Sequence, residues 1–396
     1  MKKKVCILYF SNIAGESRVL NEIEMARKNF QVDVIGYGDW QPPAGVRFLR
    51  LERNRRSFSF LARYFLLLIG GRIAPRMYDA AFWLKPEYQQ AVRLLKQGNY
   101  NLIHANDWDS LPVAIEGSNN SCSRVVFDSH EYTPEQNADN LLVRLFIKPY
   151  KIWLLKKYMH QVDSAITVSE HICGLYKKNY GVTMSVVLNV QNYKKIHFKP
   201  VNLECIHIIH HGIATSGRYL EAMIDMIRLT DKRYHLNFML IPVLHPGYMA
   251  KLKKHAKTVA AERVTFWDPV LPSEIVNFIQ RFDLGLPLLK VRQMSHFYSL
   301  PNKFFQFIMA GLGVVVSPLP TMAQVIDTYA IGKISASQTA EDMASMLNAL
   351  SADEINTFKR NSLKLAKVYN AEREMQKLLL IYQSLLAEDY IKNRNY

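Results

Sequence analysis

Short apolar runs alternate with amphipathic stretches along most of the chain. Val5–Phe10 is a continuous apolar run, a stretch of helical spacing follows up to Asn29, and Val32–Gly36 is a second, mostly apolar run. Strands inside a parallel sheet are apolar on both faces, because helices cover both sides of the sheet. The opening therefore predicts a strand, a helix and a parallel strand. Further strands of this kind are predicted at residues 101–105, 124–128, 162–168 and 185–188.

The same alternation restarts after a polar break at residues 189–202, which is typical of an interdomain linker. Strands are predicted at residues 205–211, 235–241, 264–267, 284–289 and 314–317, with a helix from Arg218. A chain of 396 residues is too long for one typical hydrophobic core. The predicted fold class is therefore α/β, with two Rossmann-like doubly wound domains that face each other across a cleft. We expect an N-terminal domain at 1–195, a C-terminal domain at 196–370, and a helix at 371–396 that crosses back toward the N-terminal domain.

The region from Arg47 to Lys85 departs from this alternation. It is rich in arginine and contains the apolar run Phe58–Ile69. A basic amphipathic helix of this kind can lie on an anionic membrane with its apolar face at the headgroup boundary. The other interpretation is a helix packed on its own sheet with its arginines facing water. The sequence leaves both open.

The net charge indicates the kind of partner, and the cysteines indicate the cellular compartment. Lysine and arginine exceed aspartate and glutamate by 50 to 34, which gives a formal charge of +16 and favours anionic partners. No nucleic-acid-binding motif occurs, so nucleic acid is not an expected partner. The four scattered cysteines suit reduced thiols, and no apolar run is long enough for a membrane helix. We expect a cytoplasmic protein, with attachment to the inner face of the plasma membrane left open.

Polar residues follow several predicted strands. His104 and Asp107 follow one strand, and His130 and Glu131 follow the next. In doubly wound sheets the ligand crevice lies at the carboxyl ends of the strands, so these side chains are candidates for a site. A histidine in such a place is also often a structural residue with its hydrogen bonds satisfied.

The stretch from Ser299 to Ser317 predicts a loop, a short helix and a buried strand. Pro301 suits the start of a helix, and Gly311 suits its end. The free N–H groups at the start of such a helix can bind an anion. On its own, the pattern favours an ordinary α/β unit whose helix packs on the sheet.

Three segments resemble family 4 retaining glycosyltransferases. Leu-Pro-Asn-Lys-Phe-Phe-Gln-Phe-Ile-Met-Ala-Gly-Leu-Gly-Val-Val-Val-Ser, which begins at Leu300, is similar to the donor-binding segment of that family, although its two glutamates are replaced by Tyr298 and Gln306. His211–Glu221 is similar to the glycine loop whose cation holds the donor diphosphate. Arg218 takes the place of that cation, whereas Ile213 stands where many members have a second arginine; Lys303, Lys290 and Arg292 are possible substitutes. Asp128–Glu135 resembles the segment whose histidine faces the transferred sugar.

The resemblance implies a glycosyltransferase of the fold called GT-B, which moves a sugar from a nucleotide diphosphate donor to an acceptor hydroxyl with retention. The C-terminal domain would bind the donor, and the N-terminal domain a glycan or lipid-linked acceptor, as in the synthesis of bacterial surface polysaccharide or glycolipid. Asp107-Trp108-Asp109 has the spacing of a metal-binding motif, but that motif belongs to glycosyltransferases with a different fold, and we interpret the match as a coincidence. We therefore expect no metal or other cofactor. The implied catalytic residues are His130, Glu131 and Arg218, and the implied donor-binding residues are Gly15, Gly212, Arg218, Val270, Tyr298, Ser299, Leu300, Asn302, Lys303 and Gln306.

Two other functions remain open at this point. A nucleotide-sugar 2-epimerase would have the same fold and a different reaction. A binding or partner subunit without catalysis would fit the loss of both family glutamates, at Tyr298 and Gln306.

Overall fold

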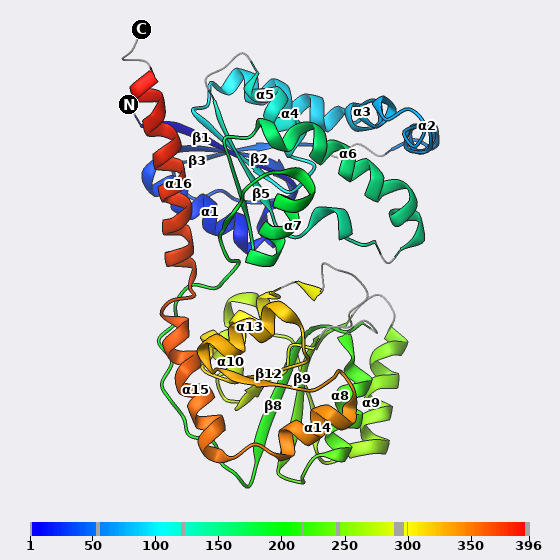
Figure 1. The fold of residues 1–396 in the computed structure, drawn as a ribbon, viewed down its shortest axis with the longest axis vertical. Helices are drawn as coiled ribbons and strands as arrows, with labels where there is room; N and C mark the ends of the chain where they lie inside the picture. Colours follow the sequence, from blue (N-terminus) through cyan, green and yellow to red (C-terminus); the bar gives the residue numbers. More distant parts are fainter. Residues whose placement is uncertain are drawn as a thin grey trace. The chain divides into compact units, whose positions relative to one another are not determined.

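The protein is represented by a computed structural model that describes residues 2–52, 56–119, 123–138, 140–215, 218–242, 246–288, 297–298 and 300–392, with the side chains of 246 and 388–392 left aside. The chain forms two compact units. Unit 1 comprises Met1–Asn189 and Glu374–Tyr396, and unit 2 comprises Val190–Arg373. Each unit is a parallel sheet with helices, so the predicted α/β class is confirmed (Figure 1).

The sheet of unit 1 has seven strands in the order β3-β2-β1-β4-β5-β6-β7, and every adjacent pair is parallel. Its inner strand β1 is buried from Val5 to Phe10, because helices cover both faces of the sheet. The strands are β1 (Lys4–Asn12), β2 (Gln31–Tyr37), β3 (Val46–Arg50), β4 (Leu102–Asn106), β5 (Arg124–Ser129), β6 (Ser164–Thr167) and β7 (Ser185–Val186).

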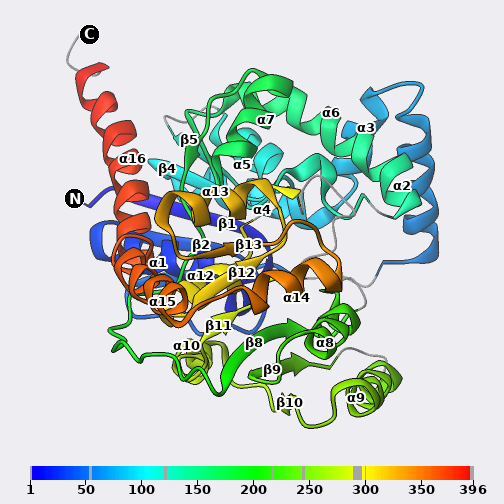
Figure 2. The same cartoon turned by 60° about the horizontal axis from the view of Figure 1, so that its bottom comes forward.

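The helices of unit 1 connect these strands (Figures 1 and 2). They are α1 (Ser17–Asn29), α2 (Phe58–Gly70), α3 (Arg76–Trp83), α4 (Pro86–Gly98), α5 (Leu111–Ser118), α6 (Lys148–Tyr158) and α7 (Glu170–Tyr180), with the short turns η1 (Ile13–Gly15), η2 (Thr133–Glu135), η3 (Val143–Ile147, a π-helix) and η4 (Met159–Gln161).

The last helix, α16 (Ala371–Lys392), completes the core of unit 1 although it follows unit 2 in sequence. Leu378 and Tyr382 are fully buried in one cluster with β1 residues such as Val5 and Ile7. The carboxylate of Glu374 accepts a hydrogen bond of 2.9 Å from the backbone of Leu188. The helix predicted at the C-terminus is therefore part of the N-terminal fold.

The sheet of unit 2 has six parallel strands in the order β10-β9-β8-β11-β12-β13. The strands are β8 (Ile206–Ile213), β9 (Tyr234–Ile241), β10 (Val264–Trp267), β11 (Leu284–Gly285), β12 (Gly313–Val316) and β13 (Gly332–Ile334). The helices are α8 (Leu220–Leu229), α9 (Pro246–Ala260), α10 (Ile275–Ile279), α12 (Asn302–Met309), α13 (Pro320–Tyr329), α14 (Ala340–Asn348) and α15 (Ala352–Ala366), with the turn η6 (Pro272–Glu274). The helix predicted from Arg218 begins at Leu220, because Tyr219 has a φ of +54° and breaks the helical geometry.

Within residues 47–85, the structure places the apolar run Phe58–Ile69 in a helix, α2. The segment begins with strand β3, in which Arg47 pairs with Asp33 of β2, and continues with the separate helices α2 and α3. Only Leu68 of α2 is buried, so α2 is not a helix packed on its own sheet. No helix among the described residues is long and apolar enough to cross a membrane.

Candidate functional site

The strand order of unit 2 reverses between β8 and β11. In doubly wound sheets a ligand binds outside the carboxyl ends of the strands at such a switch point. The β8 end carries His210, His211 and Gly212, and helix α12 lies next to it with Lys303 in its first turn. This end of the sheet is therefore the expected ligand site of unit 2.

Lys303 is buried against the end of β8, with only 7% of its surface exposed. Its neighbours on α12, such as Phe304 and Phe307, are fully buried and fix the helix against the sheet. The Nδ1 atom of His210 donates to the carbonyl of Leu286 at 2.6 Å, so its Nε2 is free to accept from Lys303 Nζ at 3.3 Å. Burial and the nearby Arg218 hold the pKa of Lys303 well below its usual value.

The charges at this end of the sheet have one sign. Burial and Lys303 lower the pKa of His211 to about 3 and the pKa of His210 well below its usual value, so both histidines stay neutral. Burial also lowers the pKa of Arg218. Neither Lys303 nor Arg218 forms an ion pair with any carboxylate in the described part of the chain. A buried and a half-buried cation without a counter-ion are costly unless an anion binds there.

Gly212 keeps space open beside Lys303. It has a φ of +131°, which favours glycine, and an added Cβ would lie 3.1 Å from Lys303 Nζ. The structure thus brings together Gly212, Lys303 and Arg218, three of the residues predicted for the donor site. Lys303, one of the three possible substitutes for the missing second cation, thus lies close to Arg218.

The other predicted donor-site residues lie around this cluster to different degrees. Asn302 is exposed at the start of α12, and Gln306 is half-buried one turn later. Tyr298 and Leu300 are half-buried in the segment before α12, whereas Ser299, Lys290 and Arg292 lie outside the described residues. Val270 follows the edge strand β10 and Gly15 ends η1 in unit 1, so neither comes from the elements that carry the cluster.

In unit 1 the predicted His130 lies directly after β5. Its Nε2 is 2.9 Å from Asn106 Oδ1, and its Nδ1 is 3.7 Å from the carboxylate of Asp107. The ring of Tyr9 lies 5.9 Å from the imidazole ring. The side chain is thus held by residues at the ends of β1 and β4. Glu131 is exposed next to it.

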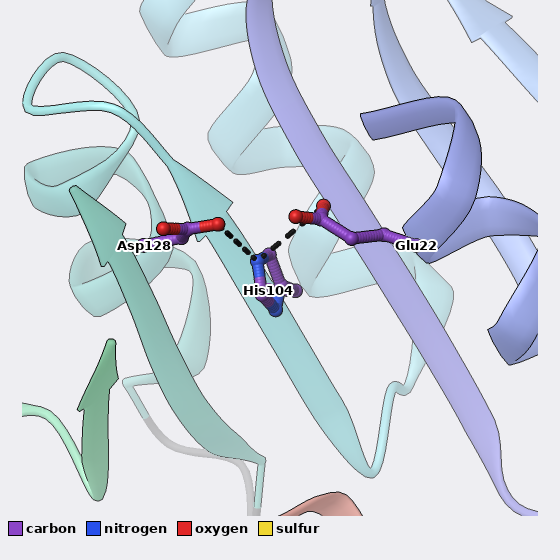
Figure 3. A group of neighbouring side chains, drawn as sticks. All are labelled: Glu22, His104 and Asp128. Atoms are coloured by element: carbon purple, nitrogen blue, oxygen red, sulfur yellow. Dashed lines mark ion pairs between the residues drawn. The ribbon is translucent and has the colours of Figure 1, made fainter. Parts of the chain in front are cut away.

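Glu22, His104 and Asp128 form a fully buried polar cluster next to His130. Figure 3 shows Glu22 and Asp128 pointing at His104 from opposite sides. Arg18 binds Asp128 through two hydrogen bonds of 2.5 and 2.9 Å. Although burial alone would raise the pKa of Asp128, Arg18 lowers it well below its usual range. Burial, with Asp128 next to it, raises the pKa of Glu22 well above its usual value.

The atoms of Glu22, His104 and Asp128 are close enough to hold a metal ion, all lying within 4.8 Å of one another. A metal does not fit the surroundings, because the Arg18 guanidinium already supplies the positive charge that Asp128 requires. The Nδ1 of His104 is 2.8 Å from the hydroxyl of Tyr382 on α16. We therefore interpret the cluster as the support of the β4 and β5 ends rather than as a metal centre.

Sequence reasoning did not find Arg18, Glu22 or Asn106. Arg18 and Glu22 are four residues apart on α1 and so share one helix face, but their partner Asp128 is 110 residues from Arg18. The only signal in the sequence was a pair of opposite charges on a helix, which is usually solvent-exposed.

Comparisons with solved structures define the class of fold. The chain is similar to the crystal structure of Anabaena HepE in complex with UDP, with a TM-score of 0.71, 14% identity, and coverage of 96% of this chain and 100% of that chain. It is also similar to sucrose-phosphate synthase from Thermosynechococcus elongatus (TM-score 0.70, 12% identity, 98% and 100% covered) and to α,α-trehalose 6-phosphate synthase from Burkholderia multivorans (TM-score 0.66, 10% identity, 99% and 98% covered). The fold is that of the GT-B glycosyltransferases.

Residues 22–190 match the sequence-family model described as Glycosyltransferase Family 4. The predicted resemblance to family 4 glycosyltransferases of the GT-B fold is therefore confirmed. None of the curated proteins is a significant match in sequence.

Proposed function

We propose that this protein transfers a sugar from a nucleoside diphosphate donor to an acceptor hydroxyl, with retention at the anomeric carbon and without a metal. The observation that carries the proposal is the pair of cations at the switch point of unit 2, the buried Lys303 and the half-buried Arg218. Neither cation pairs with a carboxylate of the described residues, and two such cations suit a diphosphate anion.

The two cations act on the leaving group. As the bond between the anomeric carbon and the phosphate oxygen breaks, its electron pair passes to the diphosphate, and the charge on that oxygen grows. Arg218 and Lys303 stabilise this charge, which a divalent ion does in metal-dependent transferases. In a retaining transfer the acceptor oxygen bonds to the anomeric carbon on the face that the diphosphate leaves, and the hydroxyl proton passes to a phosphate oxygen. His130 is placed by Asn106 and Asp107 to orient a sugar hydroxyl.

Gln306 and Tyr298 take the places of the family's two glutamates. The amide of Gln306 keeps one carbonyl acceptor for a ribose hydroxyl, without the added strength of a charge. The Anabaena HepE structures hold UDP, or UDP-glucose. We therefore propose a uridine diphosphate sugar as the donor.

Titration calorimetry with UDP, GDP, ADP and CDP tests this function. We expect one diphosphate, UDP, to bind at micromolar concentration. Incubation with the matching nucleotide sugars and an acceptor, followed by proton NMR, then reports the configuration of the product. Release of an epimerised free sugar without an acceptor would favour the 2-epimerase instead, and no binding of any diphosphate would favour a partner subunit without catalysis.

A second proposal concerns the surface around α2. Phe58 and Ile73 are 87% and 89% exposed, and α2 contacts η3 through the rings of Phe65 and Phe146, 5.2 Å apart. We call this surface the α2–η3 patch. Its exposed apolar residues are Phe58, Leu61, Phe65, Leu66, Ile69, Ile73, Leu141, Leu142 and Leu145.

The charges around the α2–η3 patch are all positive in sequence. Residues 53–78 and 140–162 contain no aspartate or glutamate, whereas they contain arginines such as Arg63, Arg72 and Arg144. Of the basic residues in these segments, Arg56, Lys148 and Lys157 pair with carboxylates of other segments. Apolar side chains next to arginines such as Arg63 and Arg72 fit a bilayer with anionic headgroups. We propose that the α2–η3 patch binds the protein to an anionic membrane. Such binding would suit synthesis of surface polysaccharide or glycolipid at the inner face of the plasma membrane.

Co-sedimentation of the protein with lipid vesicles tests this membrane binding. The protein should sediment with phosphatidylcholine vesicles that contain 30% phosphatidylglycerol on the order of tenfold more than with phosphatidylcholine alone, because each basic residue near an anionic surface contributes about 1 kcal/mol. Phe58→Ser with Leu66→Ser should abolish most of this binding. The matched control is Leu271→Ser, since Leu271 is 72% exposed in unit 2. Equal binding by all variants, or a dimer by light scattering that depends on Phe58, would contradict the proposal.

A further inference from the structure

Two adjoining pockets lie at the carboxyl edge of the unit 1 sheet. The strand order of unit 1 reverses between β1 and β4, so this edge is also a switch point. The first pocket, of about 510 Å³, is lined by Phe10 from β1, Tyr37 from β2 and Asp109 from the loop after β4. We call it the Asp109 pocket. Asp107, two residues earlier in that loop, is the carboxylate beside His130, so the pocket adjoins the candidate site of unit 1.

One wall of the Asp109 pocket is a chain of buried polar groups. Lys85 Nζ donates to the hydroxyl of Tyr88 at 2.9 Å, and that hydroxyl donates to Asp109 Oδ2 at 3.4 Å. Lys85 is 8% exposed and Tyr88 is 3% exposed. Burial, with Asp107 nearby, raises the pKa of Asp109 to about 7, and burial lowers the pKa of Lys85. A carboxyl group perturbed in this way and placed on a pocket wall is typical of a functional site.

The remaining lining is aromatic with a charged rim. The ring of Phe10 meets the ring of Tyr88 edge-on at 4.5 Å and lies 6.2 Å from the ring of Tyr37. Arg56 and Glu87 form an ion pair of 2.9 Å at the rim. A sugar ring has apolar C–H faces and hydroxyl groups at its edge, so it needs aromatic surface together with a few fixed acceptors and donors.

The second pocket, of about 730 Å³, shares Tyr37 with the first. Its lining adds Ser11, Asn12, Gly38, Arg50, Leu51 and Glu52. Hydroxyl, amide and charged side chains in this lining can donate to and accept from further sugar hydroxyls. Two pockets that share one tyrosine have room for two successive sugar units.

We propose that the two pockets form the acceptor site, that Asp109 accepts a hydrogen bond from an acceptor hydroxyl, and that the acceptor is a glycan of at least two sugar units. This inference rests on the proposed function and assigns the acceptor side of the same reaction. It gives Asp109 a role in binding a sugar, in place of the metal role that its sequence motif suggests.

Saturation-transfer NMR with a panel of methyl glycosides and disaccharides of glucose, galactose, mannose and N-acetylglucosamine tests this site. We expect at least one disaccharide to bind more tightly than its methyl glycoside. Asp109→Asn and Tyr88→Phe should each weaken that binding at least tenfold, because each removes one group of the polar wall and leaves the packing unchanged. Glu116→Gln is the matched control, since Glu116 is an exposed carboxylate on α5 paired with Lys96.

Two further readouts separate this inference from a structural effect and from the proposed function. The groups that face Asp109 are Asp107, Lys85 and Tyr88, with Arg56 and Glu87 at the rim. Binding should strengthen between pH 6 and pH 8 as Asp109 ionises, and Asp109→Asn should lose this dependence. UDP binding in unit 2 should be the same in wild type and variants. If UDP binds and no saccharide does, or if Asp109→Asn binds as wild type does, the acceptor site is wrong; if UDP itself fails to bind, the proposed function fails.

Discussion

Lys303→Met and Arg218→Ala should each weaken UDP binding by about 10- to 150-fold, and the double variant should show no measurable binding. Each substitution removes a hydrogen bond between a cation and a phosphate, and such a bond contributes about 1.5–3 kcal/mol. Titration calorimetry measures the change. Lys333→Met is the matched control, because Lys333 lies in the same unit and pairs with Glu354 at the surface.

The same substitution at Lys303 should raise the stability of the free protein. Burying the Lys303 amine without a counter-ion costs free energy whether the amine stays charged or gives up its proton, so methionine at this position removes a penalty. The free energy of unfolding in urea should therefore increase while binding is lost. At a pH above the lowered pKa of Lys303, UDP binding should also take up protons in wild type, because a diphosphate beside the amine raises that pKa. Unchanged binding by Lys303→Met, or binding without proton uptake, would contradict the assigned role.

Arg18→Met should destabilise unit 1 by about 3–5 kcal/mol, because it leaves the Asp128 carboxylate buried without its cation. The guanidinium of Arg18 binds both carboxylate oxygens and also donates to the Val187 carbonyl at 2.7 Å. Unfolding in urea at pH 7 measures the loss. The double variant Arg18→Met with Asp128→Asn should recover part of it, since no buried charge is left.

The pH dependence of this loss has a defined sign. Arg18 lowers the pKa of Asp128 in the folded state, so the pair stabilises the protein above the unfolded pKa of about 3.9, and that stabilisation disappears as the pH falls below it. The difference between wild type and Arg18→Met should therefore shrink in acid. Arg27→Met is the control, because its ion pair with Glu24 is partly exposed and contributes on the order of 0.5 kcal/mol. An equal loss in both variants would rule out the buried pair as the cause.

The sequence predicted most of the strands and the presence of His130 at a strand end. Continuous apolar runs such as Val5–Phe10 have few other interpretations, and polar residues after a strand are easily recognised. The short strand β3 was missed because only Val46, Phe48 and Leu49 are apolar in it, and its arginines indicated a basic surface.

The environment of the site residues was less predictable. Lys303 was one of three substitutes for a missing cation, and nothing in its own segment indicates that it is buried against His210. Asp109 looked like a coincidental motif because its partners Lys85 and Tyr88 lie more than twenty residues earlier in sequence. Burial and pairing across such distances depend on the completed sheet, which local patterns do not specify.

The place of α16 has a consequence for the order of synthesis. Unit 1 is made first on the ribosome, yet Leu378 and Tyr382 fill its core, and the hydroxyl of Tyr382 is 2.8 Å from Nδ1 of the buried His104. Domains generally fold as units, from the N-terminus onward during translation. In this chain, α16 is translated only after the whole of unit 2. The core of unit 1 therefore stays incomplete for the time needed to add about 200 residues. A chaperone that shields the uncovered face of β1 and α1 during this interval would act on the same surface that α16 later covers.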